Sequence, residues 1–254
     1  MTKLSANLGF LWTELSLPDA IRAAAAAGFE AVECHWPYAV EPEDVKFALS
    51  ESGLEMLGLN TDRGNLDAGE NGLSALAGRE VEARFAIDQA IEYAVAIGTK
   101  NIHVMAGFAE GAVAHSTLVT NLRYGLAKAE PHGITLLIEP LNHHDAPGYF
   151  LTDADQAAEI IAEIGSDSLK LMFDCYHLQI MQGDISRLLE KMMPISGHIQ
   201  IAAVPSRAEP DEGELDYRNI LKLIDNLGYK GFIGAEYKPR GSTDEGLGWV
   251  KAIV

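Results

Sequence analysis

The chain has 254 residues, of which 48% are hydrophobic, and its mean hydropathy is +0.02. These values predict a globular protein with a sizeable core, and the length fits two small domains or one (β/α)8 barrel, which typically has about 250 residues. The formal net charge of −18 argues against a nucleic-acid partner, because phosphates require a basic surface. If the substrate is a small acid, a metal ion or a few basic side chains must supply positive charge locally.

The sequence also bears on membranes and compartment. No apolar stretch reaches the roughly 20 residues that span a bilayer, and the N-terminal segment lacks the charge and apolar core of a signal peptide. The two cysteines, Cys34 and Cys175, are too few for a disulfide framework and fit a reducing compartment. We therefore expect a cytoplasmic protein without a membrane partner.

Short apolar runs alternate with longer amphipathic stretches along the whole chain. The apolar runs predict strands over residues 4–10, 31–35, 55–60, 101–106, 134–139, 169–174, 197–202 and 231–236. The stretches between them predict helices over residues 18–27, 42–52, 79–97, 116–132, 153–164, 184–192, 217–227 and 244–253. Most of these helices run directly into a glycine, which readily takes the left-handed conformation that ends a helix.

This alternation has no linker and no change in composition. It predicts an α/β fold, a parallel (β/α)8 TIM barrel, as a single domain over residues 1–254. An open doubly wound sheet shares the alternation, but no strand leads into a convincing G-x-G-x-x-G turn. Two long loops follow the third and seventh strands, and the first of them, residues 61–78, is a candidate lid.

Polar side chains stand at the carboxyl ends of nearly all the predicted strands, where the active site of such a barrel lies. In GITLLIEPLN (133–142) an apolar run leads into Glu139, and Asp174, Gln200 and Glu236 end the next three strands in the same way. A buried, unpaired charge is unfavourable, so four such ends in succession predict a shared function. The earlier strand ends carry Asn7, Glu33, His35, Asn60 and His103.

Three carboxylates and one amide oxygen form an all-oxygen ligand set. Such a set suits Mg²⁺ or Mn²⁺ better than zinc, which favours cysteine and histidine. Without a cation, three carboxylates in one pocket would repel each other strongly. The alternative is that each carboxylate caps a neighbouring helix or pairs with a lysine.

Four segments carry more specific motifs: IEPLNHHDAPGYFLT (138–152), FDCYHLQIMQGD (173–184), GHIQIAAVPSRAEPDEGELDY (197–217) and EYKP (236–239). These segments closely resemble the hydroxypyruvate isomerase family, which belongs to the xylose-isomerase-like barrels, and the resemblance covers essentially the whole chain. It implies that Glu139, Asp174, Gln200 and Glu236 bind the metal. It also implies that Glu139 and Glu236 are the catalytic proton-transfer pair, and that His177 binds substrate.

The resemblance implies an aldose–ketose-type isomerase of a small hydroxy-oxo acid, with conversion of hydroxypyruvate to 2-hydroxy-3-oxopropanoate (tartronate semialdehyde) through an enediolate. A 2-oxo-tetronate isomerase or a ketose 3-epimerase would use the same glutamate pair. Gln200 favours the keto-acid isomerases, because sugar-epimerase relatives usually have histidine there. Ala203 stands where related sequences often have aspartate, which leaves the exact substrate open. An endonuclease of the same superfamily, which needs several zinc ions, and a non-catalytic binding protein are alternatives from other classes.

Further substrate contacts are predicted from position. Arg207 lies in the loop after the seventh strand and could clamp a carboxylate bidentately, or it could be a solvated surface residue. Lys238 could supply positive charge to the substrate or pair with a surface acid. His103 could contact the substrate or a residue behind it, and Asn7 faces the same end of the barrel. Family members often associate, so a homo-oligomer is also open.

Overall fold

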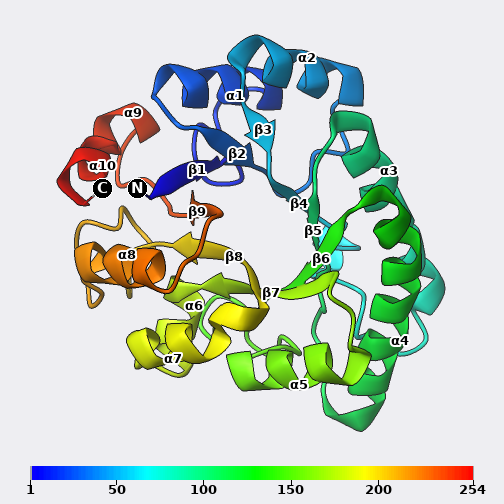
Figure 1. Ribbon diagram of the computed structural model, residues 1–254. Helices are drawn as coiled ribbons and strands as arrows, with labels where there is room; N and C mark the ends of the chain where they lie inside the picture. The colour runs from blue at the N-terminus through cyan, green and yellow to red at the C-terminus, as the bar shows by residue number, and fades with distance from the viewer. Residues whose placement is uncertain (1, 254) are drawn as a thin grey trace.

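Over residues 2–253, which this computed structural model describes, nine short strands form one parallel sheet that curls into a barrel, with helices around its outside (Figure 1). The strands are β1 Lys3–Asn7, β2 Ala31–Glu33, β3 Glu55–Met56, β4 Gly58–Asn60, β5 Asn101–His103, β6 Thr135–Ile138, β7 Leu169–Asp174, β8 Ser196–Ile201 and β9 Phe232–Ala235. Each lies within or directly beside a predicted strand. The expected domain bounds, 1–254, include two terminal residues that lie outside the described range.

The barrel closes through the third predicted strand, which is split into β3 and β4. The sheet order runs β3-β2-β1-β9-β8-β7-β6-β5-β4, and only Leu57 separates its two ends. The Leu57 N–H donates to the Val32 carbonyl at 2.7 Å, and the Leu57 carbonyl accepts from the Asn101 N–H at 3.2 Å. Leu57 therefore forms backbone hydrogen bonds to β2 on one side and β5 on the other, and these bonds close the sheet. The predicted (β/α)8 barrel is confirmed.

The helices also follow the predicted order. They are α1 Leu17–Ala26, α2 Pro42–Ser52, α3 Glu80–Ile97, α4 Gly111–Ala129, α5 Ala154–Ile164, α6 Cys175–Met181, α7 Ile185–Met192, α8 Tyr217–Asn226, α9 Thr243–Gly246 and α10 Gly248–Ile253, with 3-10 turns η1 Leu66–Ala68, η2 Glu130–His132 and η3 Met193–Ile195. Most boundaries lie within one residue of the prediction, and two differences are larger. Helix α4 begins well before residue 116, and the predicted last helix is divided into α9 and α10.

Helix α6 was not predicted. It follows β7 without a loop, because the carboxylate of Asp174 accepts a hydrogen bond from the Tyr176 N–H at 2.8 Å and caps the new helix. Asp174 therefore ends a strand and begins a helix at once. Its second carboxylate oxygen is left to face the barrel mouth.

Hydrophobic spacing explains how the helices pack on the sheet. In α5 the buried side chains are Ala154, Ala157, Ile160 and Ile161, a three- and four-residue spacing that places them on one face. Most strand residues are buried, as expected when helices cover the outside and side chains fill the inside. No helix within residues 2–253 combines the length and apolarity needed to cross a membrane.

The loop over residues 61–78 is fixed in its second half. The Ser74 and Ala75 N–H groups donate to the carbonyls of Met105 and Ala106, at 3.2 and 2.8 Å, just beyond β5. The start of α3 holds the loop further, since Arg79 forms an ion pair with Glu70 at 2.7 Å. The lid role stays a prediction.

Candidate metal and active site

The predicted ligands lie on four adjacent strands. Glu139 directly follows β6, Asp174 ends β7, Gln200 is on β8 and Glu236 directly follows β9, and all four are at most 6% exposed. Asp174 and Gln200 are register partners across β7 and β8, so their side chains leave the sheet on the same face. The barrel therefore brings the four together at the carboxyl ends of its strands.

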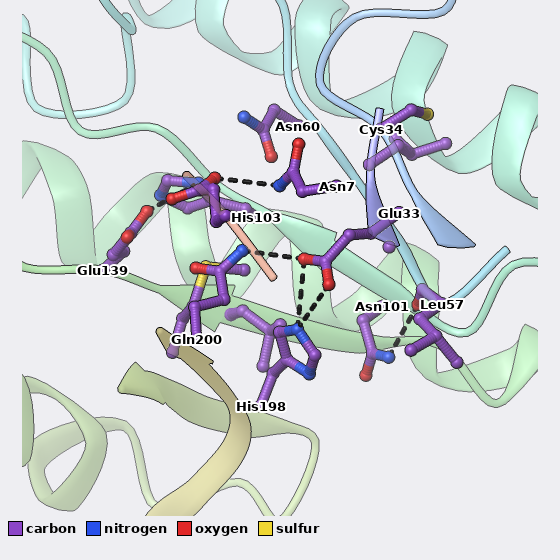
Figure 2. Close-up of a pocket in the computed structure, with 15 residues that line it drawn as sticks. Asn7, Glu33, Cys34, Leu57, Asn60, Asn101, His103, Glu139, His198 and Gln200 are labelled. Atoms are coloured by element: carbon purple, nitrogen blue, oxygen red, sulfur yellow. Dashed lines mark hydrogen bonds and ion pairs between the residues drawn. The ribbon is translucent and has the colours of Figure 1, made fainter. Parts of the chain in front are cut away.

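A compact acidic cluster results. One ligand atom from each of Glu139, Asp174, His177 and Glu236 lies within 4.8 Å of the others, and all four residues are buried. Beside them is an enclosed space of about 20 Å³, lined by Glu139, Gln200 and Glu236 among others (Figure 2). This volume has room for one water-sized particle.

Unpartnered oxygens show what the cluster can hold. Glu139 Oε1, Asp174 Oδ2 and Gln200 Oε1 are buried and accept no hydrogen bond from any described residue. A buried polar atom without a partner costs about 1–3 kcal/mol, and orphaned buried groups are rare in folded proteins. Three such oxygens on three neighbouring strands fit a cation, which would satisfy all of them at once. The cluster can therefore hold a metal ion.

Glu236 differs from these groups because both of its carboxylate oxygens already accept hydrogen bonds. Its Oε1 accepts from Asn7 Nδ2 at 2.9 Å and lies 3.1 Å from His35 Nε2, and its Oε2 accepts from Arg207 Nη2 at 2.8 Å. Asn7 is itself oriented, since its Oδ1 accepts from the Gly9 N–H at 2.9 Å. Gly9 also makes room, because a Cβ there would lie 2.1 Å from the His35 ring.

Arg207 lies at the cluster and not on the exposed surface. Its side chain is 12% exposed and its guanidinium lies between the rings of Phe10 and Tyr176, 4.7 and 5.0 Å from their centroids. Besides Glu236, it pairs with Asp145 at 3.1 Å and approaches Asp174 at 4.0 Å. The sequence analysis did not predict Asp145, which lies in the loop after β6, where no periodic pattern marks it.

The hydrogen bonds of His177 define its tautomer. Its Nδ1 accepts from the Asn142 N–H at 2.9 Å and lies 2.8 Å from Asn142 Nδ2. Burial and the charge of Arg207 lower the pKa of His177 to about 3, so the ring is neutral. With Nδ1 accepting, the proton resides on Nε2, which lies 3.6 Å from Asp174 Oδ2. His177 therefore presents a donor to the cluster, and this tautomer has no free lone pair there for a metal.

The other two predicted contacts differ in position. His103 is buried, with Nδ1 3.4 Å from Glu139 Oε2 and with no partner for Nε2 among the described residues. Burial lowers its pKa to about 4, so it is neutral beside Glu139. Lys238 is exposed, with its Nζ 6.0 Å from the Phe10 ring centroid, and it does not join the cluster.

The carboxyl groups differ in acidity when no metal is bound. Burial and the charge of Glu236 raise the pKa of Asp174 to about 7, and burial with the same neighbour raises the pKa of Glu139 well above its usual range. Burial would also raise the pKa of Glu236, but the His35 hydrogen bond and the charge of Arg207 outweigh it and hold that pKa at about 2. A cation that used Asp174 and Glu139 as anionic ligands would displace their protons.

Comparisons with known proteins agree with this geometry. Residues 21–253 match the family model described as "Xylose isomerase-like TIM barrel". The chain is 45% identical to the 2-oxo-tetronate isomerase of Cupriavidus necator, covering 100% of this chain and 99% of that protein, and 40% identical to the hydroxypyruvate isomerase of Escherichia coli, covering 98% of each. A crystal structure from Brucella melitensis, described as "AP endonuclease, family 2", is 39% identical, has a TM-score of 0.96 and covers 99% of both chains. The expected family is confirmed: the chain belongs to the xylose isomerase-like TIM barrel family.

Proposed function

We propose that this chain is a divalent-metal-dependent isomerase of a small hydroxy-oxo acid. The named reaction is the aldose–ketose-type conversion of hydroxypyruvate to 2-hydroxy-3-oxopropanoate (tartronate semialdehyde). The observation that carries the proposal is the buried cluster in which two glutamates, from β6 and β9, flank unpartnered oxygens. The names of the relatives at 40–45% identity support the same substrate class.

The proposed metal ligands are Glu139, Asp174, Gln200 and Glu236. This set contains only oxygens, which favours Mg²⁺ or Mn²⁺. A metal bound there would act as a Lewis acid that polarises the substrate carbonyl. His177 does not belong to the proposed set, because its Nδ1 accepts from Asn142 and its protonated Nε2 faces the cluster.

Glu139 and Glu236 would be the catalytic proton-transfer pair. One carboxylate removes a proton from the hydroxyl-bearing carbon, and the other group, as an acid, returns a proton to the former carbonyl carbon. Because the reaction is reversible, each group serves both roles. The support is positional, since the two residues follow separate strands, yet their oxygens lie within 4.8 Å of each other.

The substrate would be bound by groups around this pair. The guanidinium of Arg207 supplies positive charge beside the cluster for the substrate carboxylate, and His177 Nε2–H supplies a hydrogen bond. Asn7 and His103 would act at the glutamates, each through the hydrogen-bond or short contact already described. Lys238, which is exposed, would only raise the local potential at the entrance.

A 2-oxo-tetronate, one carbon longer, is the second candidate substrate. The specific observation that favours it is the 45% identity to the Cupriavidus necator enzyme of that name, against 40% to the Escherichia coli hydroxypyruvate isomerase. Both acids carry a carboxylate beside a carbonyl and would use the same residues. A ketose 3-epimerase stays a prediction, because the epimerase structures are below 20% identity and speak only for the fold.

The remaining partners are also proposals. We propose that nucleic acid is not a substrate, because the net charge of −18 opposes a phosphate backbone. A cytoplasmic location is supported by Cys34 and Cys175, which are buried and unpaired. A single domain over residues 1–254 is supported by the closed barrel. A homo-oligomer stays a prediction from the sequence.

The test is proton exchange followed by ¹H NMR in D₂O with Mg²⁺ or Mn²⁺. Hydroxypyruvate, a 2-oxo-tetronate and D-tagatose are incubated in parallel with the wild type and with Glu139→Gln. Deuterium entry into one of the acids, lost in the variant, is the expected result, and it also chooses between the two acids. Exchange in tagatose alone would reassign the protein as an epimerase, and no exchange in any compound despite bound metal would contradict catalysis on this class.

A further inference from the structure

Glu33 is a buried carboxylate that the proposed reaction does not use. It ends β2 and is 4% exposed. Its Oε2 accepts from Gln200 Nε2 at 2.7 Å, and its Oε1 accepts from Ser5 Oγ at 2.7 Å. His198 Nε2 lies 3.1 Å from both oxygens (Figure 2). Both oxygens of Glu33 therefore act as acceptors.

This contact decides which end of the Gln200 amide faces the cluster. An ionised carboxylate can only accept hydrogen bonds, so it holds the NH₂ end of the amide and repels the oxygen end. In Figure 2 the nitrogen of Gln200 points to Glu33, and its oxygen points the other way, to the side where Glu139 lies. That oxygen is one of the buried atoms without a partner.

A glycine on the neighbouring strand makes the arrangement sterically feasible. A Cβ on Gly234 of β9 would lie 2.4 Å from Glu33 Oε1, 2.8 Å from Gln200 Cγ and 3.0 Å from His198 Nε2. Two of these separations are shorter than any real Cβ contact. A glycine inside a strand often marks such a close approach. The absence of a side chain at Gly234 therefore leaves the space in which Glu33 and Gln200 contact each other.

We propose that Glu33 is a positioning residue that orients the Gln200 amide, so that its oxygen and not its nitrogen is presented to the metal site. This inference rests on the proposed function, because it takes Gln200 as a ligand of the cation. Without a hydrogen-bond partner, a carboxamide can rotate and turn either its oxygen or its NH₂ group toward the cluster. With Glu33 behind it, Gln200 acts as a neutral oxygen ligand of fixed direction, in the way that outer carboxylates orient metal-bound histidines.

The first test needs no metal and no change at Glu33. In the metal-free wild type, the side-chain NH₂ signals of Gln200, identified by their loss in Gln200→Ala, should exchange slowly with water because one N–H is bonded to Glu33. Fast exchange of both protons in a folded protein would overturn the proposal.

The second test is Mn²⁺ titration calorimetry on the wild type, Glu33→Gln, Gln200→Ala and the double variant. Glu33→Gln should weaken Mn²⁺ binding about 10–100-fold, the usual range for such outer residues. In the double variant, the loss should equal that of Gln200→Ala alone, because Glu33 acts through Gln200. Ser5→Ala is the matched control, since it removes another contact of Glu33 but leaves the acceptor, and its affinity should match the wild type.

The outcomes separate this inference from the proposed function. Wild-type affinity in Glu33→Gln, or losses that multiply in the double variant, would overturn the positioning role while the metal site stands. A wild type that binds no Mn²⁺ would overturn the proposed function itself. Unfolding curves of the metal-free variants establish that each is folded before the affinities are compared.

Discussion

The two halves of the barrel differ in what their strand ends offer. Strands β6 to β8 end in oxygens that have no hydrogen-bond partner within residues 2–253, on Glu139, Asp174 and Gln200. Strands β1 and β2 end in side chains that already form hydrogen bonds within the site. Asn7 donates to Glu236, and Glu33 accepts from Gln200. In the proposed site, the half with β6 to β8 would supply oxygens to the metal and the half with β1 and β2 would orient Glu236 and Gln200.

We expect the largest effect on activity from substitutions in the proposed proton-transfer pair. Glu139→Gln and Glu236→Gln each keep the shape of the side chain but remove the ability to accept and return a proton. Each should lower the rate of hydroxypyruvate or 2-oxo-tetronate isomerisation by about 10²–10⁴-fold. The measurement is the rate of solvent-deuterium entry at saturating metal. Activity within a few-fold of the wild type in either variant would remove that residue from the pair.

A matched pair of basic residues gives the next largest effect. Arg207→Gln removes a buried guanidinium next to Glu236, whereas Lys238→Gln removes an exposed charge a short distance away. Charge-assisted hydrogen bonds contribute about 1.5–3 kcal/mol, so Arg207→Gln should lower kcat/KM for the acid about 10- to 150-fold. Lys238→Gln should change it little. Equal losses would show that only net charge near the entrance matters.

A substitution of Asn7, at the end of β1, tests whether that strand orients Glu236. Asn7→Ala removes the donor to Glu236 Oε1 at 2.9 Å and leaves the proposed ligands unchanged. The expected loss is about 10–100-fold in metal affinity or activity, smaller than for the glutamates themselves. Calorimetry with Mn²⁺ and the exchange rate together would show which of the two suffers. If neither changes, strand β1 has no orienting role.

Stabilisation by metal should depend on pH. In the metal-free fold the pKa of Asp174 is raised to about 7, and the pKa of Glu139 is raised well above its usual range. A raised carboxyl pKa contributes stability below the unfolded value, and this stability is lost as pH rises through the folded value. The metal-free protein should therefore lose stability between about pH 4 and pH 8, by up to about 1.4 kcal/mol per pH unit for each proton released.

Bound metal should offset this loss of stability, because it binds the ionised forms of the two carboxyl groups. The increase in Tm caused by Mn²⁺ should therefore grow from pH 5 to pH 8. Glu236, whose pKa is held at about 2, is ionised throughout this window and adds no slope. The comparison is with Asp174→Asn, in which the dependence should flatten. A Tm increase that is independent of pH would mean that the ion does not displace protons from these carboxyl groups.

The architecture and the proposed ligands could be predicted because both are local patterns. The repeated apolar run ending in a carboxylate marks β6, β7 and β9, and the alternation with amphipathic stretches marks the barrel. Helix α6 was missed because it is short and follows β7 without a turn residue. The early start of α4 was missed because its N-cap residue, Glu110, is not one of the residue types that usually cap a helix.

The partners of the site residues could not be predicted from the sequence. Glu33 and Gln200 are 167 positions apart, and Asn7 and Glu236 are 229 apart, so no local spacing relates them. The position of Arg207 between Phe10 and Tyr176 likewise depends on three segments that are far apart in the sequence, one of them helix α6. Gly234 was the one available signal, as a glycine inside a strand, but it identifies crowding without naming the side chains that cause it.

We propose above all that the buried oxygens form a divalent-metal site. The most direct measurement is a crystal structure of the protein with Mn²⁺, with the ion located by its anomalous scattering. The account predicts one strong peak within coordination distance of oxygens from Glu139, Asp174, Gln200 and Glu236, with His177 Nε2 outside the ligand set. A peak elsewhere, or a fully loaded crystal with none between β6 and β9, would contradict it.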